Sequence, residues 1–286
     1  MSIVTLLSDW GLSDYYAAAV KGRLYGEWPE VRVVDISHQI PKYDIVSAAY
    51  VLRQAYPYFP QGTIHCIGVN DIATEKQPHI IVLEAGQYFI GTDNGLFTRL
   101  FDHKPAAAWR ILLAPDGHAA TFPSLNLFPL VALHLGRGGH PEEIGEPYGW
   151  PDRNFNMHTN VAFCDYDYAP DGRPAGACIT GSIIYIDSYG NGVTNITRPM
   201  FEQALAEFPR FEIRLQSYDA RRGKKPFNRI SRVYADEPEA DLCALFLDNQ
   251  QLEISLSHAS AAQLINMKLG SAVRIYFRPG QTVITG

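Results

Sequence analysis

The chain has 286 residues with a formal net charge of −6, and 47% of its residues are apolar and 19% charged. This composition is typical of a globular protein that is soluble in water, and the length is enough for one large domain or two ordinary ones. Because no basic stripe is present, we expect no nucleic-acid partner. No apolar run is long enough to cross a bilayer, and the first residues lack the basic segment of a signal peptide.

The four cysteines are scattered along the sequence and form no CxxC pair. Their spacing indicates neither a zinc site nor a disulfide framework, so we expect no metal ion. Cysteines of this kind are commonly buried apolar side chains in a reducing compartment, and we therefore expect a cytoplasmic protein. The four are Cys66, Cys164, Cys178 and Cys243.

The first turn of the chain carries two carboxylates between an expected strand and an expected helix. Residues 3–7 are an uninterrupted apolar run, which favours a strand covered on both faces. Residues 15–25 favour a helix, and Asp14 is expected to cap it. Asp9 has no such role, so we expect it to bind a ligand beyond the carboxyl end of the strand. A carboxylate there can accept hydrogen bonds from both hydroxyls of a diol such as ribose.

Strand and helix signals alternate up to about residue 136. Asp44 is predicted to cap a helix, and Ala85-Gly86 is predicted to join two strands in a tight turn. Pro129 is expected either to lie in the first turn of another helix or to kink it. The alternation predicts an α/β domain with a mostly parallel sheet and helices on both faces. The expected strands are residues 31–36, 62–69, 79–84, 87–91 and 110–113, and the expected helices are residues 44–56 and 125–135.

Prolines and glycines between residues 142 and 156 indicate a linker, which we place at residues 146–156. The domains are then residues 1–145 and 157–286. The second domain has weak helical signals apart from residues 259–269, and its short strands predict a small barrel or sandwich. Its expected strands are residues 175–186, 210–216, 230–234, 242–247, 251–256 and 272–277.

Several familiar motifs are absent: the sequence has no GxGxxG after the first strand, no GxxxxGK[ST], no HExxH and no GxSxG, so a nicotinamide or P-loop enzyme is not expected. Instead, aspartates follow several of the expected strands. An acidic cleft lined by aromatic residues suits a ligand with an aromatic base, a diol and a positive centre. The alternative is that the aspartates only form turns. This alternative is favoured for Asp93, but it is disfavoured for Asp9 and Asp71 taken together. The aspartates are Asp9, Asp35, Asp71, Asp93 and Asp187, and the nearby aromatic residues are Trp10, Tyr15, Tyr16, Tyr43 and Tyr189.

Six segments resemble, in the same order, those of the S-adenosylmethionine hydroxide adenosyltransferase and halogenase family, which contains the fluorinase and the chlorinase. Together they span nearly the whole chain. The segments are SDWGLSDYYAAAVKG (residues 8–22), DISHQIPKYDIVSAAYVL (35–52), YFPQGTIHCIGVND (58–71), FIGTDNGLFTRL (89–100), TFPSLNLFPLVALHL (121–135) and IDSYGNGVTNI (186–196).

The resemblance implies an N-terminal α/β domain, a smaller C-terminal β-barrel domain, and a homotrimer with sites shared between subunits. S-adenosylmethionine would be the substrate and no cofactor would be needed. By motif position, Asp9 would hold the ribose hydroxyls, and Tyr43 would form a wall of the site. Asp14 would open the loop toward the methionine part, with Tyr15 and Tyr16 close by. The implied contacts of the second domain are Asp187, Tyr189 and Asn191, at the methionine amino group and the adenine, with Asn249 and Ala259 as further contacts.

The leaving methionine is neutral, so the protein must mainly align a nucleophile with C5′ and remove its water. By the resemblance, Asp71 matches the aspartate of the hydroxide-transferring branch. The halogenases have a tyrosine at the matching position. A carboxylate there would repel a halide ion but could orient or deprotonate water. Ser124 matches the serine of the halogenase pocket, which weakly favours the other branch.

Three positions depart from the family pattern. Lys76 stands near the arginine of the hydroxide branch without its fork geometry, Pro123 replaces a histidine, and Ser257 stands where the halogenases have an arginine. The loop after Asp71 is also shorter. These departures leave open a relative that binds adenosine or S-adenosylmethionine without turnover.

We predict an S-adenosylmethionine hydrolase that forms adenosine, with Asp71 as base, Lys76 as electrostatic partner and Ser124 as pocket donor. Besides the binding relative, the alternatives are an S-adenosylmethionine-dependent halogenase and an α/β enzyme that acts on another nucleoside.

Overall fold

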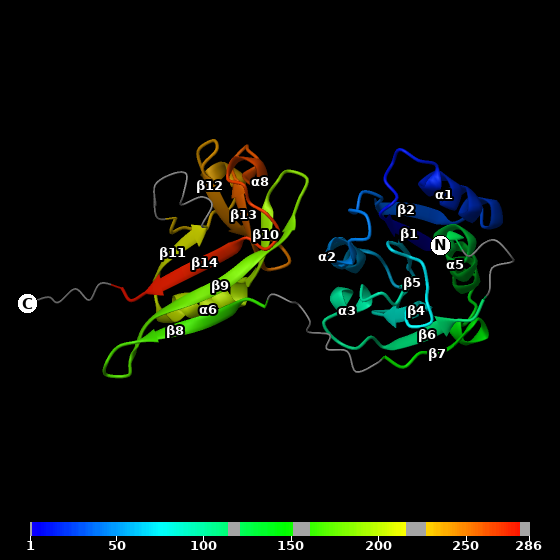
Figure 1. Ribbon diagram of the computed structural model, residues 1–286, viewed down its shortest axis with the longest axis horizontal. Helices are drawn as coiled ribbons and strands as arrows, with labels where there is room; N and C mark the ends of the chain where they lie inside the picture. Colours follow the sequence, from blue (N-terminus) through cyan, green and yellow to red (C-terminus); the bar gives the residue numbers. More distant parts are fainter. Residues whose placement is uncertain (1, 114–120, 151–160, 216–226, 281–286) are drawn as a thin grey trace, which may run out of the picture. The chain divides into compact units, whose positions relative to one another are not determined.

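The computed structural model describes residues 2–113, 121–150, 161–215 and 227–280. The chain divides into two compact units, Met1–His158 and Thr159–Gly286, and each unit has its own sheet (Figure 1). Buried apolar side chains form separate cores in the two units. None of the described helices combines the length and the apolar character needed to cross a lipid bilayer.

The first unit contains a mixed sheet with the strand order β2-β1-β3-β5-β4-β6-β7. The ladders β1–β2, β1–β3 and β3–β5 are parallel, whereas β4–β5, β4–β6 and β6–β7 are antiparallel. The prediction of a mostly parallel sheet is therefore wrong. The cause is the tight turn at Ala85-Gly86, where positive φ angles of 50° and 74° fold β5 directly back along β4. The strands are β1 Ile3–Ser8, β2 Arg32–Ser37, β3 Ile64–Gly68, β4 His79–Glu84, β5 Gln87–Thr92, β6 Ala107–Ile111 and β7 Gly145–Pro147.

Helices cover both faces of this sheet (Figure 1). Successive side chains of a strand point to opposite faces, and in β1 Leu6 packs in the core with α1 and α5 while Leu7 packs in the core with α2 and α3. The prediction of a first strand buried on both faces is thus confirmed. The helices are α1 Tyr16–Glu27, α2 Ile45–Ala55, α3 Phe97–Leu100, α4 Pro123–Asn126 and α5 Phe128–Gly136, with short 3₁₀ turns at η1 Tyr56–Tyr58 and η3 Pro141–Glu143.

The two predicted caps have different outcomes. Asp44 caps α2, and its carboxylate accepts hydrogen bonds from the backbone N–H groups of Val46 and Ser47 at 3.0 Å each. The predicted cap by Asp14 is wrong, because α1 begins after Tyr15 and has no side-chain cap. Tyr15 already has helical dihedral angles (φ −75°, ψ −8°), whereas a capping residue usually has extended ones.

The first half of the predicted linker is packed within the first unit. Residues 145–147 pair with β6 as strand β7, and Tyr148 and Trp150 pack against the core next to α3. The Tyr148 hydroxyl donates a hydrogen bond of 2.7 Å to Asp93. Residues 151–156 lie outside the described residues.

The second unit is an antiparallel sheet with the order β11-β14-β9-β10-β13-β12, and β8 pairs with β9. It curls around its core, to which α6 contributes Phe201 and Ala204 (Figure 1). No ladder joins β11 to β12 among the described residues. The sheet is therefore a curled half-barrel, and closure of the expected barrel is not confirmed. The elements are β8 Phe163–Tyr168, β9 Pro174–Ile186, β10 Gly192–Thr197, α6 Arg198–Glu207, β11 Arg210–Leu215, η4 Tyr234–Asp236, β12 Leu242–Phe246, β13 Gln251–Leu256, α8 Ala261–Leu264 and β14 Ala272–Arg278.

The predicted strand at residues 230–234 is wrong. The Asp236 carboxylate accepts hydrogen bonds from the backbone N–H groups of Arg232 at 2.7 Å and Val233 at 3.2 Å. These are the donors that a neighbouring strand would need, and the segment turns into η4 instead. Ser231 keeps one sheet-like contact, from its N–H to the carbonyl oxygen of Ala244 at 2.7 Å.

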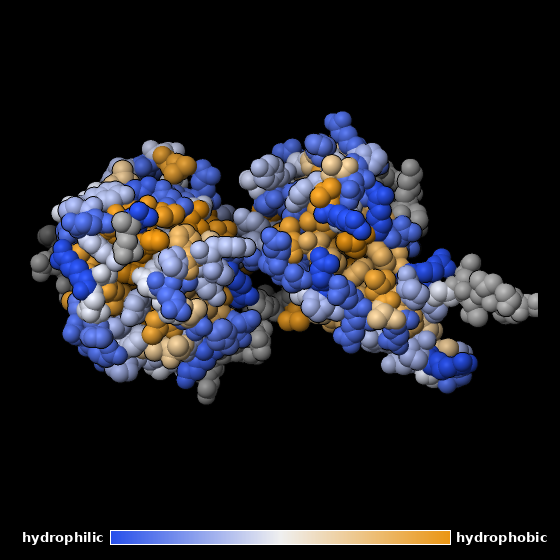
Figure 2. Space-filling model, turned by 180° about the vertical axis from the view of Figure 1, so that it is seen from behind, coloured by the Kyte–Doolittle hydropathy of each residue, from blue (hydrophilic) through white to orange (hydrophobic). Residues whose placement is uncertain are grey.

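The surface carries apolar side chains between hydrophilic ones in both units, as the face drawn in Figure 2 shows. Several exposed apolar side chains of the first unit belong to the turn after β1 and to the segments beside it. They are Leu12, Tyr15, Tyr43, Val46 and Ile72. Exposed apolar groups that gather in this way often mark a surface that contacts a ligand or another protein.

Candidate functional site

Asp9 lies at the carboxyl end of β1 and is 8% exposed. Its carboxylate accepts a hydrogen bond of 2.8 Å from the backbone N–H of Tyr43, and its carbonyl oxygen accepts one of 2.6 Å from Lys42 Nζ. Tyr43 has a φ of 63°, which is unusual for a bulky residue, and its side chain is exposed. The segment around residue 43 therefore holds the Asp9 carboxylate from one side.

Trp10, next to Asp9, forms the centre of an aromatic cluster. Its ring stacks on His38 with a centroid distance of 5.6 Å and meets Phe122 edge-on at 5.4 Å. His38 is fixed in turn, because Ser8 Oγ lies 2.7 Å from its Nδ1 and Asp35 lies 3.1 Å from its Nε2. Trp10 is therefore held over the ends of the central strands.

Gly68, the last residue of β3, leaves the space in which the Trp10 ring and the Ser124 hydroxyl approach each other. A Cβ atom at this position would lie 2.4 Å from the Trp10 ring and 2.7 Å from Ser124 Oγ. Real Cβ atoms do not approach other atoms this closely. Only glycine allows Trp10 and Ser124 to meet over the end of the strand.

Asp71 follows β3 by three residues and is the second carboxylate of the site. Both the hydroxyl and the backbone N–H of Ser124 donate to its Oδ2, the latter at 3.3 Å. Its carbonyl oxygen accepts hydrogen bonds of 2.8 Å from His79 Nε2 and from Thr92 Oγ1. Backbone and side chain of Asp71 are thus both fixed.

The electrostatic surroundings of Asp71 favour a carboxyl that accepts a proton. Burial raises its pKa above the ordinary value, the hydrogen bonds from Ser124 and the charge of His79 oppose that rise, and the charge of Asp9 adds to it. The contribution from Asp9 indicates that the structure brings the two carboxylates into one neighbourhood. A partly desolvated carboxylate next to a hydroxyl donor can hold and deprotonate a water molecule.

His79 is a site residue that the sequence interpretation missed. It is the first residue of β4, its ring meets Phe128 edge-on at 5.3 Å, and burial lowers its pKa while the backbone and the charge of Asp71 raise it. The signal in the sequence is its position eight residues after Asp71, at the start of an expected strand.

The remaining candidates of the first unit lie at its surface. Lys76 is exposed in a turn closed by backbone hydrogen bonds of 3.0 Å and 3.1 Å between Thr74 and Gln77. Asp14 is exposed as well. Tyr15 and Tyr16 are in contact, with a centroid distance of 4.7 Å, and Tyr16 also meets Phe122 at 5.4 Å, which joins it to the Trp10 cluster. Pro123 begins α4, directly before Ser124.

In the second unit, Asp187 organises a tight turn between β9 and β10. Its Oδ1 accepts hydrogen bonds from the backbone N–H groups of Tyr189 at 3.0 Å and Asn191 at 2.8 Å, and its Oδ2 accepts one of 3.2 Å from the Asn191 side chain. Gly190 has a φ of 85° and lies against Ser260. The Tyr189 ring is 78% exposed, because the turn directs it away from the core.

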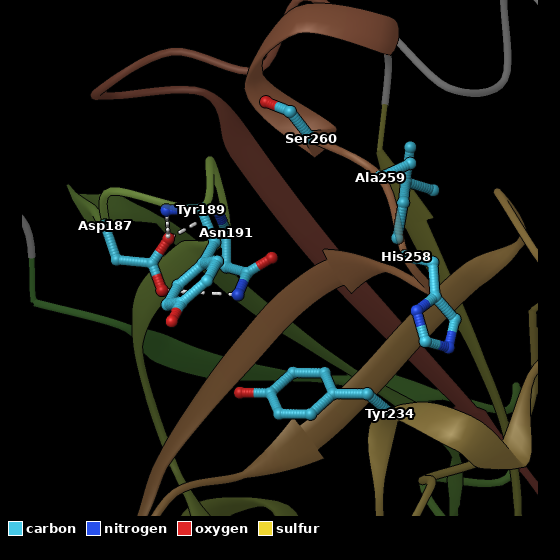
Figure 3. Close-up of a pocket in the computed structure, with 8 residues that line it drawn as sticks. Asp187, Tyr189, Asn191, Tyr234, His258, Ala259 and Ser260 are labelled. Carbon is cyan, nitrogen blue, oxygen red and sulfur yellow. Dashed lines mark hydrogen bonds between the residues drawn. The ribbon is translucent and has the colours of Figure 1, made fainter.

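These residues line a pocket of about 730 Å³ (Figure 3). Four of the predicted contacts, Asp187, Tyr189, Asn191 and Ala259, are brought together in it. The other lining residues were not predicted from the sequence. Tyr234 belongs to the segment, residues 230–234, that was wrongly predicted to be a strand. The additional lining residues are Tyr234, Leu256, His258 and Ser260.

Asn249 and Ser257 do not line this pocket. Asn249 lies in the turn before β13 and its side chain bonds to Gln251 at 2.9 Å. Leu256 of the pocket is the last residue of β13, about 17 Å from the first residue, Gln251, at the usual rise per residue. Ser257 is fully buried, and its hydroxyl has no hydrogen-bond partner among the described residues.

Within the described ranges, no three His, Cys, Asp or Glu side chains are grouped so that they could hold an ion. The Asp9 carboxylate accepts a hydrogen bond from the backbone N–H of Tyr43, and the Asp71 carboxylate accepts one from the Ser124 hydroxyl.

Comparison with known proteins defines the class. Family models of the S-adenosylmethionine hydroxide adenosyltransferase N-terminal and C-terminal domains match residues 4–145 and 181–274. The chain belongs to this family. It is 36% identical over 97% of its length to a protein of Methanocaldococcus jannaschii named (R)-S-adenosyl-L-methionine hydrolase, of which it covers 97%.

Two further relatives show the range of the family. A protein of Thermus thermophilus with the same hydrolase name is 27% identical over 96% of this chain and 100% of the relative. A protein of Nocardia brasiliensis named fluorinase is 24% identical over 96% of each chain. Members of the family are thus named both as hydrolases and as fluorinases.

Solved structures share the fold. An uncharacterized conserved protein of Thermotoga maritima aligns with a TM-score of 0.76 at 23% identity, over 96% of this chain and 99% of that one. A conserved hypothetical protein of Thermus thermophilus aligns with a TM-score of 0.68 at 26% identity, over 96% of this chain and 100% of that one.

Proposed function

We propose that the protein hydrolyses S-adenosylmethionine to adenosine and methionine, with water attacking C5′. The observation that carries this proposal is the Asp71 carboxyl, which is half-buried, held by Ser124 through two hydrogen bonds, and close enough to Asp9 for their charges to interact. A fixed, desolvated carboxylate is suited to water as nucleophile and is unsuited to a halide ion.

The reaction balances without a cofactor. The water oxygen forms a bond to C5′, the C5′–S bond breaks, and its electron pair returns to sulfur, which becomes a neutral thioether. The proton that water loses passes to Asp71 and then to solvent. Because burial and Asp9 raise the pKa of Asp71, this carboxylate is a better proton acceptor than an exposed aspartate.

The other candidate residues have supporting roles in this proposal. Asp9 accepts the ribose hydroxyls, Tyr43 forms a wall, and the exposed Lys76 adds positive charge when the loop that carries it reaches the ligand. Tyr15, Tyr16 and Asp14 lie along the approach to the site. In the second unit Asp187, Tyr189, Asn191 and Ala259 hold the remainder of the substrate, and Asn249 is a further contact.

The homotrimer and its shared sites, which the resemblance implies, form part of the proposal. The exposed apolar side chains beside the turn after β1 are consistent with a surface that another copy covers. Analytical ultracentrifugation would test it: a species of three times 31.9 kDa is expected, and a monomer at all concentrations would contradict it. A cytoplasmic location is likewise proposed, and fractionation of the source cells would check it.

Product analysis in labelled water tests the reaction. We expect adenosine and methionine as products by chromatography, and in water enriched in oxygen-18 we expect the label in the 5′-hydroxyl of adenosine. Asp71→Asn should lower kcat by about 10²–10⁴-fold, the usual contribution of a general base. Asp102→Asn is the matched control, because Asp102 is an exposed carboxylate of the same unit.

Two outcomes would favour other functions. The fluorinase relative and the Ser124 hydroxyl support a halogenase, and formation of a 5′-halogenated adenosine in chloride or fluoride buffer would establish it instead. Pro123 and the exposed Lys76 support a relative that binds without turnover. Calorimetric binding of S-adenosylmethionine or adenosine with neither product formed would select that reading over hydrolysis.

A further inference from the structure

A buried carboxyl lies in β13, the strand that also supplies Leu256 to the second unit's pocket. Glu253, in β13, is 3% exposed and pairs with Val193 of β10 and Leu245 of β12. A glutamate in such a place is costly for the folded state unless other groups engage it. Neither the family motifs nor the pocket-lining residues include Glu253.

Tyr234 links this carboxyl to the pocket. Its hydroxyl hydrogen-bonds to Glu253, as does that of Ser255, while Glu253 Oε1 has no partner among the described residues. Figure 3 shows the Tyr234 hydroxyl directed toward the side of the pocket where Asp187 and Tyr189 lie. The charge of Asp187 acts on both Glu253 and Tyr234, so the three groups form one electrostatic unit.

The protonation of Glu253 is balanced near neutral pH. Burial is the main cause that raises its pKa to about 7; the Tyr234 hydrogen bond opposes the rise, the charge of Asp187 adds to it, and the Ser255 hydrogen bond opposes it. Cys243 of β12 is the other titratable neighbour, and burial raises the pKa of its thiol, which stays neutral. The pocket wall also carries His258 and Tyr189.

We propose that Glu253 is a positioning residue of this pocket: its carboxyl holds the Tyr234 hydroxyl and, when ionised, adds a negative charge behind Asp187. A cationic ligand is then bound more tightly when Glu253 is ionised than when it is neutral. A neutral ligand does not distinguish the two states. The inference rests on the proposed function only for the choice of S-adenosylmethionine as the cationic probe.

The proposal predicts that Glu253 releases a proton when a cationic ligand binds. When a cation enters the pocket, it favours the ionised form of Glu253, and a proton that Glu253 held passes to solvent. The release is largest where Glu253 is half protonated in the free protein and does not exceed one proton per site. Replacement of Glu253 by glutamine keeps a hydrogen-bond acceptor for Tyr234 and removes this proton.

Calorimetry at about pH 6 and about pH 8 tests the proposal, with S-adenosylmethionine and adenosine as probes. The Kd of the wild-type protein for S-adenosylmethionine should fall by up to about tenfold at the higher pH, one pKa unit of coupling, and that for adenosine should change less than about twofold. Buffers of different ionisation enthalpy should report the proton release. E253Q should lose both effects, and E207Q, which changes an exposed glutamate of the same unit outside the pocket, should keep them.

Y234F supplies a second variant. Loss of the hydroxyl removes a donor that favours the ionised carboxyl, so the midpoint of the pH effect should move upward rather than vanish. A glutamate with a purely structural role would leave the midpoint unchanged. Infrared spectra of the unliganded protein provide a readout independent of any ligand: the carbonyl band of a protonated carboxyl should titrate near neutral pH and be missing in E253Q.

The outcomes separate this inference from the proposed function. A wild-type Kd for S-adenosylmethionine that is flat across this range, or a slope that persists in E253Q, would overturn the role of Glu253. Binding that changes with pH but yields no adenosine would remove the hydrolase proposal and leave the role of Glu253 intact. Absence of any S-adenosylmethionine binding would remove both.

Discussion

Ser124 donates to the Asp71 carboxylate through both its hydroxyl and its backbone N–H, although 53 residues separate the two in the chain. The hydroxyl belongs to α4 and the carboxylate to the loop after β3. Their contact joins the two segments that the catalytic proposal needs. It also sets the protonation of Asp71, since both hydrogen bonds favour the ionised carboxyl.

Ser124→Ala should therefore shift the pH dependence of the reaction. Without the hydroxyl donor the pKa of Asp71 rises further, so the acid limb of the kcat profile should move to higher pH. We expect kcat at neutral pH to fall by about tenfold, the effect of one hydrogen bond to a charged group. The measurement is the rate of adenosine formation across pH. Thr121→Ala, an exposed neighbour, is the control, and an unshifted acid limb in S124A would contradict the assignment.

His79 should support Asp71 from the other side. His79→Phe removes the donor to the Asp71 carbonyl oxygen and, at acid pH where His79 is protonated, a charge that lowers the pKa of Asp71. We expect about tenfold lower kcat and an acid limb at higher pH. His79→Gln offers a donor without the charge and should recover part of the rate. Equal rates and pH profiles in all three proteins would show that His79 only packs against Phe128.

Gly68→Ala should damage the site more than the fold. Its Cβ would meet the Trp10 ring and Ser124 Oγ, so both must move, and overpacking of this kind costs about 1–3 kcal/mol. We expect loss of most activity with a smaller loss of stability in urea unfolding. Gly22→Ala is the matched control: its Cβ meets nothing, it lies inside α1, and it should stabilise the protein by about 0.5–1 kcal/mol. Full activity in G68A would refute the close approach.

His65 should make the first unit sensitive to acid. Burial lowers its pKa to about 4, and the hydrogen bond of 2.6 Å that His65 Nε2 donates to Gln87 Oε1 opposes this shift. The other ring nitrogen lies 2.7 Å from Thr5 Oγ1. The unfolded chain, with an ordinary histidine pKa of about 6.5, binds more protons than the folded one between these values. The free energy of unfolding should thus fall by about 3 kcal/mol as the pH drops from about 6.5 to about 4.

Urea unfolding at a series of pH values checks this prediction. His65→Gln retains hydrogen-bonding groups but does not titrate, so its free energy of unfolding should depend less on pH in that range. A wild-type curve that is equally flat would show that His65 is protonated without cost in the folded state.

Short-range signals were sufficient for much of the first unit. The apolar run of β1, the Asp44 cap of α2, the Pro129 position in α5 and the Ala85-Gly86 turn all depend on a few neighbouring residues, and all are confirmed. The strand order was not predictable in this way, because ladders such as β4–β6 are decided by packing between distant segments. In the second unit β8, β10 and α6 carried too weak a local pattern to be predicted.

The sequence by itself determined the family, the acidic ends of the strands and the residues Asp9, Asp71 and Asp187, because residue types in local motifs carry that information. The tertiary structure alone decided which side chains lie near each of them. It joined Asp71 to Ser124 and His79, placed Tyr234 and Glu253 beside Asp187, and left Lys76 exposed and Asn249 at the far end of β13. The physical reason is that burial, hydrogen bonding and charge coupling depend on distances between atoms, and these arise only when remote segments pack against one another.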